Sequence, residues 1–417
     1  MYFMKRRGYL IYILAVTLAA VFTGCGRPVT PKKIFEPRRT LTIAMSLGEE
    51  EWQVFREVIF PEFEKGHKVR IKAYQIESGQ LAVKLEALRQ SGKPEIDIFA
   101  QDNMELSAII NKDLAADLSG YEEDIPPEVL PNIVESCKFN GRLMFMPFRP
   151  NVQIVYYNHT AFTSYQIGVP RRWEVLLKVA QKFKESEGRS RFLLKAFGGN
   201  PTATQIYEFI LQADGVPYEF NDIGCIQAFR FLQELWEYTS EESLRAKWDT
   251  ANEIFARQEV YIAQNWPFGI KVLDDYELPF DYRTYSGWEG PAGERHVIGG
   301  DVFGIPVNAE NREDALRFIK YMQSQQAQSV LVSRLGWPSI RQDAYNYEGV
   351  DLRMRAHYES IKQAMEHGEF RENVTWWPAY TKYVTEAFKE IVVNGRPVEE
   401  TLNLYKQKLE EEKALYR

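Results

Sequence analysis

Three short stretches near the start of the chain decide the predicted fold: TLTIAMS at residues 40–46, VRIKAYQ at 69–75 and IDIFA at 96–100. The first two alternate apolar and polar side chains, which is typical of half-buried strands, and the third is short and apolar. Between them, residues 52–63 and 81–88 carry apolar side chains at spacings of three and four, as helices do. This alternation of strand and helix predicts a parallel sheet with helices on both faces.

Proline and glycine predict where these two helices end. Pro61 should kink or stop the first helix, because proline lacks the backbone N–H that a helix interior needs. The sequence Ser-Gly-Lys-Pro at residues 91–94 should end the second helix.

The same sheet predicts where a ligand binds. In open sheets of this kind, ligands lie beyond the carboxyl ends of the strands. That rule indicates three loops, at residues 47–50, 76–80 and 101–103.

The pattern changes beyond residue 140. Two extended runs are expected at residues 142–147 and 153–157, with two prolines between them. Helical patterns then dominate, interrupted by extended runs at 260–263 and 302–307, and helices close the chain. No internal repeat or low-complexity segment is present.

Composition limits the class of protein. A chain of 417 residues exceeds one simple core, so two domains are expected. The net charge is −7, and without Lys5, Arg6 and Arg7 it becomes −10, with 48 basic and 58 acidic residues. An acidic chain is a poor partner for phosphate backbones, so no nucleic-acid partner is expected. The 9 Trp and 23 Tyr residues include flat apolar faces that suit sugar rings.

The N-terminus predicts export and lipid attachment. Basic residues 5–7 precede an apolar run, Gly8 to Phe22, which is short for a membrane span and typical of a secretory signal. The run ends at Phe-Thr-Gly-Cys25, which resembles a bacterial lipobox with Phe22 where Leu is usual. Residues 1–24 are therefore interpreted as a signal peptide, and polar, Pro-rich residues 25–39 as the lipidated Cys25 and a tether.

Ordinary signal cleavage and an uncleaved anchor are the alternatives at this end of the chain. The lipobox interpretation predicts a protein that is lipid-anchored at the outer face of the bacterial cell membrane, or in the periplasm. Two further cysteines, Cys137 and Cys225, could pair in an oxidising compartment, and their spacing leaves that question open.

Seven segments resemble, in order, motifs of the type II extracellular solute-binding family, which includes maltose- and trehalose-binding proteins. They are PEIDIFAQD (94–102), GRLMFMPFRPNVQIVYYN (141–158), WEVL (173–176), ARQEVYIAQNW (256–266), GGDVFGIP (299–306), EDALRF (313–318) and GRPVEETL (395–402). Arg172 and Gln258 stand where the family commonly has Thr and Gly. No single segment is specific, and the resemblance depends on their order from about residue 40 to the C-terminus.

The resemblance implies an α/β fold of two discontinuous lobes joined by a hinge, the periplasmic-binding protein type II architecture, with a ligand cleft between the lobes. The implied bounds are 40–149 and 290–345 for lobe 1, and 150–289 and 346–417 for lobe 2, with the hinge near 149–151 and 283–289. It also implies a monomeric binding protein, with no catalytic activity and no cofactor, that passes a sugar ligand to the permease subunits of an ABC importer.

Acidic residues are candidate ligands for sugar hydroxyls, because a carboxylate accepts two hydrogen bonds from adjacent hydroxyls. Asp102 follows a buried strand and matches a ligand-contacting acid of the family, although it could instead cap the following helix. Glu49 follows the first strand. It could instead interact only with the positive N-terminus of the next helix. Asp301 lies in a Gly-Gly-Asp segment that could be merely a turn. Arg149 and Asn151 are candidates at the crossover between lobes.

Aromatic residues are candidate platforms for a sugar ring. Trp266 follows a strand where the family often has a stacking Trp, Trp337 follows Leu-Gly, and Trp376, Trp377 and Tyr380 form the densest aromatic cluster. Packing in the core, or under the C-terminal helix for the cluster, is the alternative for each of them.

Other functions have weaker support. The five histidines lack metal-ligand spacing, and no GxSxG or phosphate-loop motif occurs. A surface-anchored glycoside hydrolase would need two facing carboxyls about 5–10 Å apart. A binding protein for iron would favour adjacent tyrosines. Binding of another solute, such as a peptide, polyamine or phosphorylated polyol, is the more serious alternative.

Overall fold

The structure, a computed structural model, describes residues 39–345 and 352–416. The predicted signal peptide and Cys25 lie outside the described residues, as does the predicted tether except Arg39, which begins the first strand. The first lobe contains β1 (Arg39–Met45), α1 (Glu49–Val54), α2 (Phe60–Gly66), β2 (Val69–Gln75), α3 (Ser78–Ser91), β3 (Ile98–Asp102), α4 (Leu106–Ile110), α5 (Pro131–Glu135), β4 (Lys138–Phe139), β5 (Arg142–Leu143), α12 (Arg312–Met322) and α13 (Gln325–Leu335).

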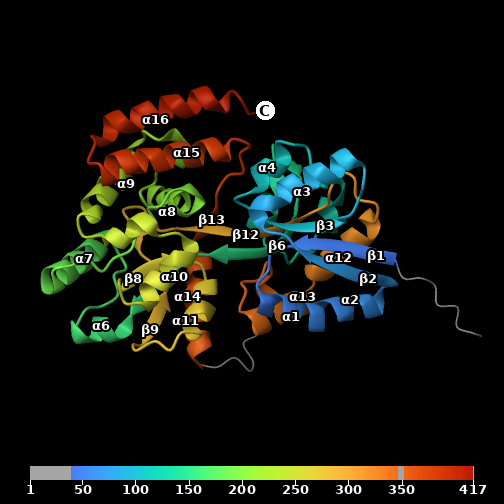
Figure 1. Cartoon of the computed structure of the whole chain (residues 1–417), viewed down its shortest axis with the longest axis horizontal. Coiled ribbons are helices and arrows are strands. Elements are labelled where there is room, and N and C mark those ends of the chain that lie inside the picture. The colour runs from blue at the N-terminus through green and yellow to red at the C-terminus, as the bar shows by residue number, and fades with distance from the viewer. Residues whose placement is uncertain (1–38, 346–351, 417) are drawn as a thin grey trace, which may run out of the picture. The chain divides into compact units, whose positions relative to one another are not determined.

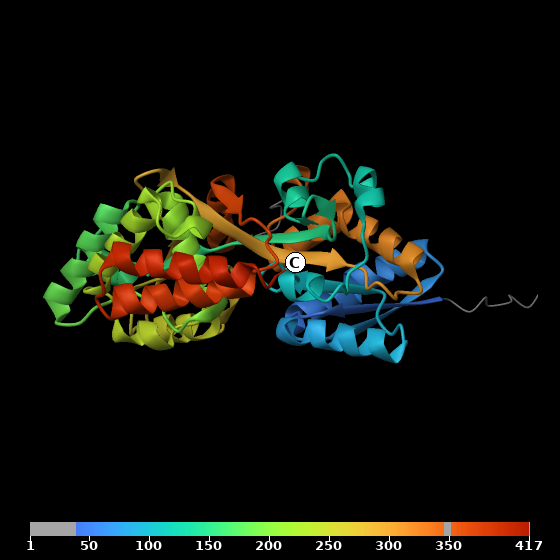
Figure 2. The same cartoon turned by 90° about the horizontal axis from the view of Figure 1, so that it is seen from above.

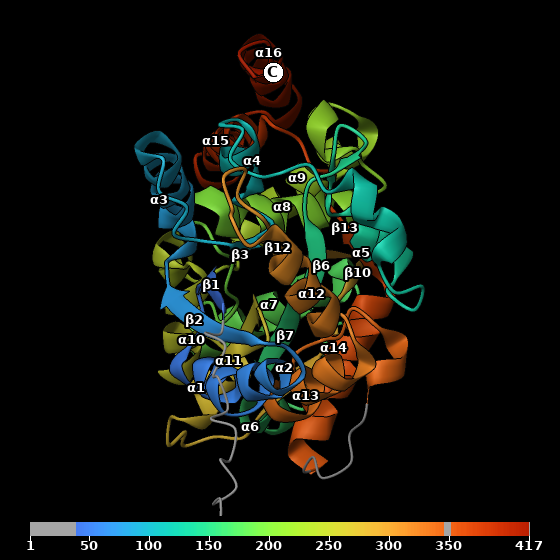
Figure 3. The same ribbon diagram turned by 90° about the vertical axis from the view of Figure 1, so that its right-hand side faces the viewer.

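The main sheet has the strand order β13-β12-β3-β1-β2, in which β1, β2 and β3 belong to the first lobe and β13 (Gly368–Phe370) to the second. Strand β1 pairs in parallel with both β2 and β3, as the alternation of strand and helix predicts, whereas β12 (His296–Gly304) runs antiparallel to β3. Helix α3 lies on one face of this sheet, and α1, α2 and α13 lie on the other (Figure 1, Figure 3). The sheet is therefore mixed, because a strand returning from the second lobe joins its parallel core.

The sequence predicts that Pro61 kinks or stops the helix after β1. The helix continues past Pro61, so of these two outcomes the stop does not occur. A π-helical turn at Phe55–Ile59 precedes α2, in which proline occupies the first turn. The wider turn changes the hydrogen-bond spacing just before the proline, whose missing N–H then costs no helical hydrogen bond. The second predicted stop is confirmed, since α3 ends at Ser91 with Gly92 in the left-handed conformation (φ 65°).

The second lobe is mainly helical around a small antiparallel sheet of order β8-β7-β9. Its elements are β7 (Ile154–Asn158), α6 (His159–Ser164), α7 (Trp173–Glu187), α8 (Gly199–Gln212), α9 (Ile223–Trp236), α10 (Trp248–Ala256), β8 (Ile262–Asn265), α11 (Phe268–Asp274), β9 (Tyr282–Tyr285), β10 (Glu289–Gly290), β11 (Gly293–Glu294), α14 (Leu352–Glu366), β13 (Gly368–Phe370), α15 (Trp377–Phe388) and α16 (Val398–Lys413).

Two antiparallel strands, β6 (Met146–Val152) and β12, run from one lobe into the other (Figure 1, Figure 2). The two prolines expected to separate extended runs instead lie inside β6, opposite Val302 and Gly300 of β12. They are tolerated because β6 pairs only with β12, which makes it an edge strand. The predicted strand at residues 302–307 in fact begins at His296, since the Gly299-Gly300 pair is extended strand and not a turn.

Two separate sets of buried apolar residues form the cores of the lobes. The first set draws on residues 41–148 and 302–337. The second lobe contains two clusters, which draw mainly on residues 152–297 and 358–409. Trp288 and Val297 pack in the second lobe and Val302 packs in the first, so the chain crosses between them within β12. The lobe bounds derived from the sequence remain a prediction.

The two described cysteines are unpaired and buried in different cores, Cys137 in the first lobe and Cys225 in the second. Burial raises the pKa of both thiols. Within residues 39–345 and 352–416, no helix combines the length and apolar character that crossing a bilayer requires.

Candidate functional site

An ion-pair network lies on the crossing strands. Arg149 of β6 donates from Nε to Asp301 Oδ2 of β12 at 2.5 Å and from Nη1 to Glu51 Oε1 of α1 at 3.2 Å. Its guanidinium carbon lies 4.0 Å from the centre of the Trp337 ring, within the range of a cation–π contact. Trp337 Nε1 in turn donates to Glu51 Oε1 at 3.0 Å. The predicted residues Arg149, Asp301 and Trp337 therefore form one cluster.

Glu51 enters this cluster because of its position in the first turn of α1. Its second oxygen, Oε2, accepts from the Gly48 backbone N–H at 2.7 Å, which caps the helix and fixes the side chain. The predicted Glu49 instead points to solvent, with 83% of its side chain exposed, and pairs with Arg56. Glu49 therefore does not join the Arg149 cluster, and the neighbouring Glu51, which was not a candidate from the sequence, does. A Glu three residues after Gly48 is itself a capping signal.

Asp102 ends β3 and lies opposite Asp301 in the β3–β12 ladder. Its Oδ1 accepts from the Met104 N–H at 2.8 Å, so the capping role considered from the sequence is present. Burial, together with the neighbouring Asp301 carboxylate, raises the pKa of Asp102 to about 7. A carboxyl group whose pKa is shifted in this way is typical of a functional site.

The loop after β3 contacts the second lobe. Glu105 Oε1 accepts from Asn200 Nδ2 at 3.0 Å, and Asn200 Oδ1 accepts from Trp377 Nε1 at 2.9 Å. Arg371 lies 4.0 Å from the centre of the Trp377 ring and donates from Nη2 to the Asn103 carbonyl. Asn200, Glu105 and Arg371 were missed from the sequence, because none lies in a segment that resembles the family motifs.

The predicted Trp266 lies against the other end of the crossing strands. A Cβ atom on Gly299 would come within 2.6 Å of its ring, so glycine allows the outer edge of the indole to lie close to the β12 backbone. Gly299 is the ladder partner of the predicted Asn151. Asn151 uses its Oδ1 to accept from the Val152 N–H at 3.1 Å. Trp266 and Asn151 therefore share the crossing strands with the ion-pair network.

Two predicted residues lie apart from this set. Tyr380 is fully buried among the rings of Tyr207, Tyr218 and Phe220 in the second core. Trp376 packs edge-on against Tyr218, with their ring centres 4.6 Å apart. For these two residues the structure shows the packing alternative that the sequence left open.

A buried polar network lies behind the crossing strands in the second lobe. Glu208 Oε2 of α8 accepts from the Val297 N–H of β12 at 3.0 Å, and its Oε1 lies 3.4 Å from His296 Nδ1. Burial lowers the pKa of His296, but Glu208 and Glu294 outweigh this effect and raise it to about 9. Burial lowers the pKa of the nearby Lys195 to about 7, although Glu208 opposes the shift. These contacts hold β12 to the second lobe.

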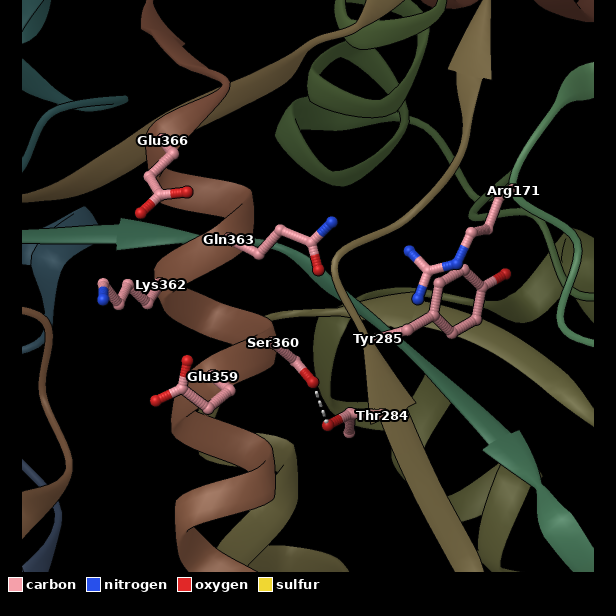
Figure 4. Close-up of a pocket in the computed structure, with 8 residues that line it drawn as sticks. All are labelled: Arg171, Thr284, Tyr285, Glu359, Ser360, Lys362, Gln363 and Glu366. Atoms are coloured by element: carbon pink, nitrogen blue, oxygen red, sulfur yellow. Dashed lines mark hydrogen bonds between the residues drawn. The ribbon is translucent and has the colours of Figure 1, made fainter.

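A surface hollow of about 340 Å³ lies elsewhere on the second lobe, between β9 and α14 (Figure 4). Thr284 Oγ1 donates to Ser360 Oγ across it at 3.0 Å, and Arg171 stands beside the Tyr285 ring. None of the ligand-binding residues predicted from the sequence lines this hollow, although Thr284 and Tyr285 belong to the predicted hinge segment 283–289. In the described part of the chain, no group of three or more His, Cys, Asp or Glu side chains is placed to hold a metal ion.

Solved structures match this architecture over most of the chain. The cyclic α-maltosyl-1,6-maltose binding protein from Arthrobacter globiformis aligns with a TM-score of 0.77 at 18% identity, covering 90% of this chain and 98% of that one. The GacH receptor of Streptomyces glaucescens gives 0.75 at 17% identity, covering 91% and 99%. Maltose-bound MalE3 of T. maritima gives 0.73 at 18% identity, covering 89% and 99%. At these identities the likeness establishes the fold.

The two lobes, their crossing strands and these alignments define the periplasmic-binding protein type II fold, which the family resemblance implies. The profile of the bacterial extracellular solute-binding protein family matches residues 49–329. The chain belongs to this family, and its function is to bind a solute.

Proposed function

We propose that this protein captures a sugar at the crossing-strand site and delivers it to an ABC importer. The observation that carries the proposal is that two indoles contact the strands that bear two carboxylates and a guanidinium. Asp102 lies at the end of β3, Arg149 on β6 and Asp301 on β12, while Trp337 contacts Arg149 and Trp266 contacts Gly299. Carboxylates and guanidinium groups bind hydroxyls by charge-assisted hydrogen bonds, and indoles cover the apolar face of a pyranose ring.

The solved relatives support a polyhydroxylated solute. Their ligands include maltose, acarbose, tagatose and ribitol, all of which present rows of hydroxyl groups. Several are described as ABC transporter solute-binding proteins. In this proposal the protein is a monomer without catalytic activity or cofactor, and binding of the solute to both lobes favours their closed arrangement before docking on the permease.

Lipid attachment at Cys25 is a further part of the proposal. It rests on the basic and apolar segment before Phe-Thr-Gly-Cys25 and on the polar stretch that follows. Substituting Cys25→Ser should move the protein from the membrane fraction to the soluble fraction of the producing bacterium. Equal membrane retention of the variant would contradict lipid anchoring.

A thermal-shift panel tests the sugar proposal. Mono-, di- and oligosaccharides, short peptides and polyamines are each added to the purified protein, and the unfolding temperature is measured. A bound sugar should stabilise the protein progressively as its free concentration exceeds its dissociation constant. Stabilisation by peptides or polyamines alone would contradict the sugar proposal, and hydrolysis of an oligosaccharide would contradict the absence of catalysis.

A further inference from the structure

The charges around the end of β3 and the crossing strands do not balance. The buried or half-buried groups that influence one another there are, among the described residues, the carboxylates of Glu51, Asp102, Glu105 and Asp301 and the guanidiniums of Arg149 and Arg371. Four acidic groups thus face two basic ones. The partners of each guanidinium show which carboxylates carry the excess negative charge.

Arg149 is paired with two of the four carboxylates. It contacts Asp301 through Nε and Glu51 through Nη1, and its flat face lies on Trp337. Since Glu51 also caps α1 and accepts from Trp337, both of its oxygens are used within the protein. In the described part of the chain, Arg149 donates hydrogen bonds to Asp301 and Glu51 and makes none to Asp102 or Glu105.

Arg371 binds neutral acceptors. It donates from Nη2 to the Asn103 carbonyl and from Nε to Met104 Sδ at 3.2 Å, while its face covers Trp377. It lowers the pKa of Asp102 and Glu105 only from a distance. Arg371 is thus committed to the loop backbone and to the indole.

Asp102 and Glu105 are left with neutral donors. Their hydrogen-bond donors in the described part of the chain are the Met104 N–H and Asn200 Nδ2 respectively. Burial raises the pKa of both carboxyls, as expected for acids without a directly paired cation. Between them lies Asn103, which is 4% exposed and whose Oδ1 has no donor in this part of the chain. One short segment therefore holds three acceptor groups that lack donors or a cation.

We propose that the solute carries an ammonium group beside its hydroxyls, as in an amino sugar or an aminopolyol, and that Asp102 and Glu105 receive this group. The inference rests on the proposed function, because it describes the ligand of the same site. An ammonium group brings three N–H donors, one each for the carboxylates of Asp102 and Glu105 and for the side-chain Oδ1 of Asn103, and one positive charge that offsets part of the excess negative charge. A neutral sugar supplies hydroxyl donors and leaves the excess negative charge buried.

Calorimetric titration of the purified protein near neutral pH tests the proposal with matched probes. The disaccharide of glucosamine is compared with its N,N′-diacetyl form, and 1-amino-1-deoxy-D-glucitol with D-glucitol; maltose and spermidine complete the set. We expect the amine of a matched pair to bind about tenfold more tightly than its neutral partner, or better, which corresponds to about 1.4 kcal/mol.

The outcomes separate this inference from the proposed function. Binding of maltose or another neutral sugar with no gain for the amines overturns the inference and leaves the proposed function standing. Binding of spermidine without any carbohydrate, or binding of none of the probes, overturns both.

Substitutions locate the preference for the amine. Asp102→Asn and Glu105→Gln should each reduce the amine-to-neutral affinity ratio towards one, because each removes a charge and keeps the shape. Glu313→Gln, which changes a side chain that is 82% exposed on α12, is the matched control and should keep the ratio. If one site variant fails to fold, the other carries the test. A ratio that is unchanged in the folded site variants overturns the proposal.

Acidification provides an independent measure with the unmodified protein. The charged groups that face Asp102 are Asp301 from β12, Glu105 from its own loop and Arg371 after β13. Below neutral pH Asp102 takes up a proton, so the amine-to-neutral ratio should fall several-fold as the pH is lowered by about two units. A ratio that rises or stays constant over this range contradicts the role of Asp102.

Discussion

Arg149 Nε donates to Asp301 Oδ2 at 2.5 Å across the two strands that join the lobes, and both side chains are more than four-fifths buried. Removing the guanidinium would leave Asp301 and Glu51 close together without their cation. We expect Arg149→Met to lower the free energy of unfolding by about 2–3 kcal/mol, near the lower end for a broken buried ion pair. Chemical denaturation measures this loss.

The control for that measurement is Arg334→Met, at an exposed position on α13 of the same lobe. It should change the free energy of unfolding by less than about 0.5 kcal/mol. Equal effects of the two substitutions would mean that the crossing-strand ion pair contributes nothing specific.

Gly300 is required by the geometry of the strand crossing. Its φ is 127°, and a Cβ atom there would lie 2.1 Å from the Arg149 carbonyl oxygen. We expect Gly300→Ala to destabilise the protein by well over about 1 kcal/mol, because both the backbone conformation and the contact are incompatible with a side chain. Gly79→Ala, in α3 with open space around the Cβ position, should be neutral or slightly stabilising. Thermal unfolding of the pair would refute this account if Gly300→Ala were the milder change.

Local patterns predicted the elements of the first lobe well. The bounds of β2 were correct because its alternation is strict, and α3 ends at a glycine that adopts a left-handed conformation. The continuation through Pro61 depends on a π-helical turn that has no local sequence signal. Strand β6 was divided in the prediction because its two prolines are acceptable only on an edge strand, and edge position is a property of the whole sheet.

Only some residues of the candidate site were candidates from the sequence, because the other contacts depend on how separate elements pack. Asp102, Arg149 and Asp301 lie in strands and in segments that resemble the family motifs, which is why they were candidates from the sequence. The choice of Glu51 over Glu49 depends on the rotation of α1, and the contribution of Asn200 depends on how the second lobe meets the β3 loop. Tyr380 was a candidate because of local aromatic density, and this density serves the second core.

Asp102 should make stability depend on pH in a defined direction. Because its pKa in the folded protein is about 7 and its ordinary value is 3.8, the native state binds the extra proton between these values. Its contribution to stability is therefore present at low pH and is lost as the pH rises through about 7. Asp102→Asn removes this loss, and we expect it to stabilise the protein by about 1–2 kcal/mol at pH 8, with a smaller difference near pH 4.

Denaturant titrations of wild type and Asp102→Asn at the two pH values measure this difference. A gap that is constant with pH, or larger in acid, would show that Asp102 is not the group responsible.

Two of the four candidate tryptophans, Trp266 and Trp376, lie in different parts of the molecule and should respond differently to substitution. Trp266 lies on the crossing strands against Gly299, whereas Trp376 packs on Tyr218 away from them. For a sugar identified by thermal shift, Trp266→Leu should weaken binding about tenfold or more through loss of the aromatic face. Trp376→Leu should keep the affinity. Calorimetric titration compares the two variants. A larger loss of affinity in Trp376→Leu than in Trp266→Leu would indicate that the sugar binds beside the second core instead.

Amide hydrogen exchange with and without a saturating solute is the most direct test of whether the solute is held at the crossing strands by both lobes, because it reports on both lobes in one experiment. We expect the solute to slow exchange in the loop after β3 and at α1 in the first lobe, and at residues 266–270 and the start of α8 in the second. Protection confined to a single lobe, or centred on the hollow between β9 and α14, would contradict a solute held at the crossing strands.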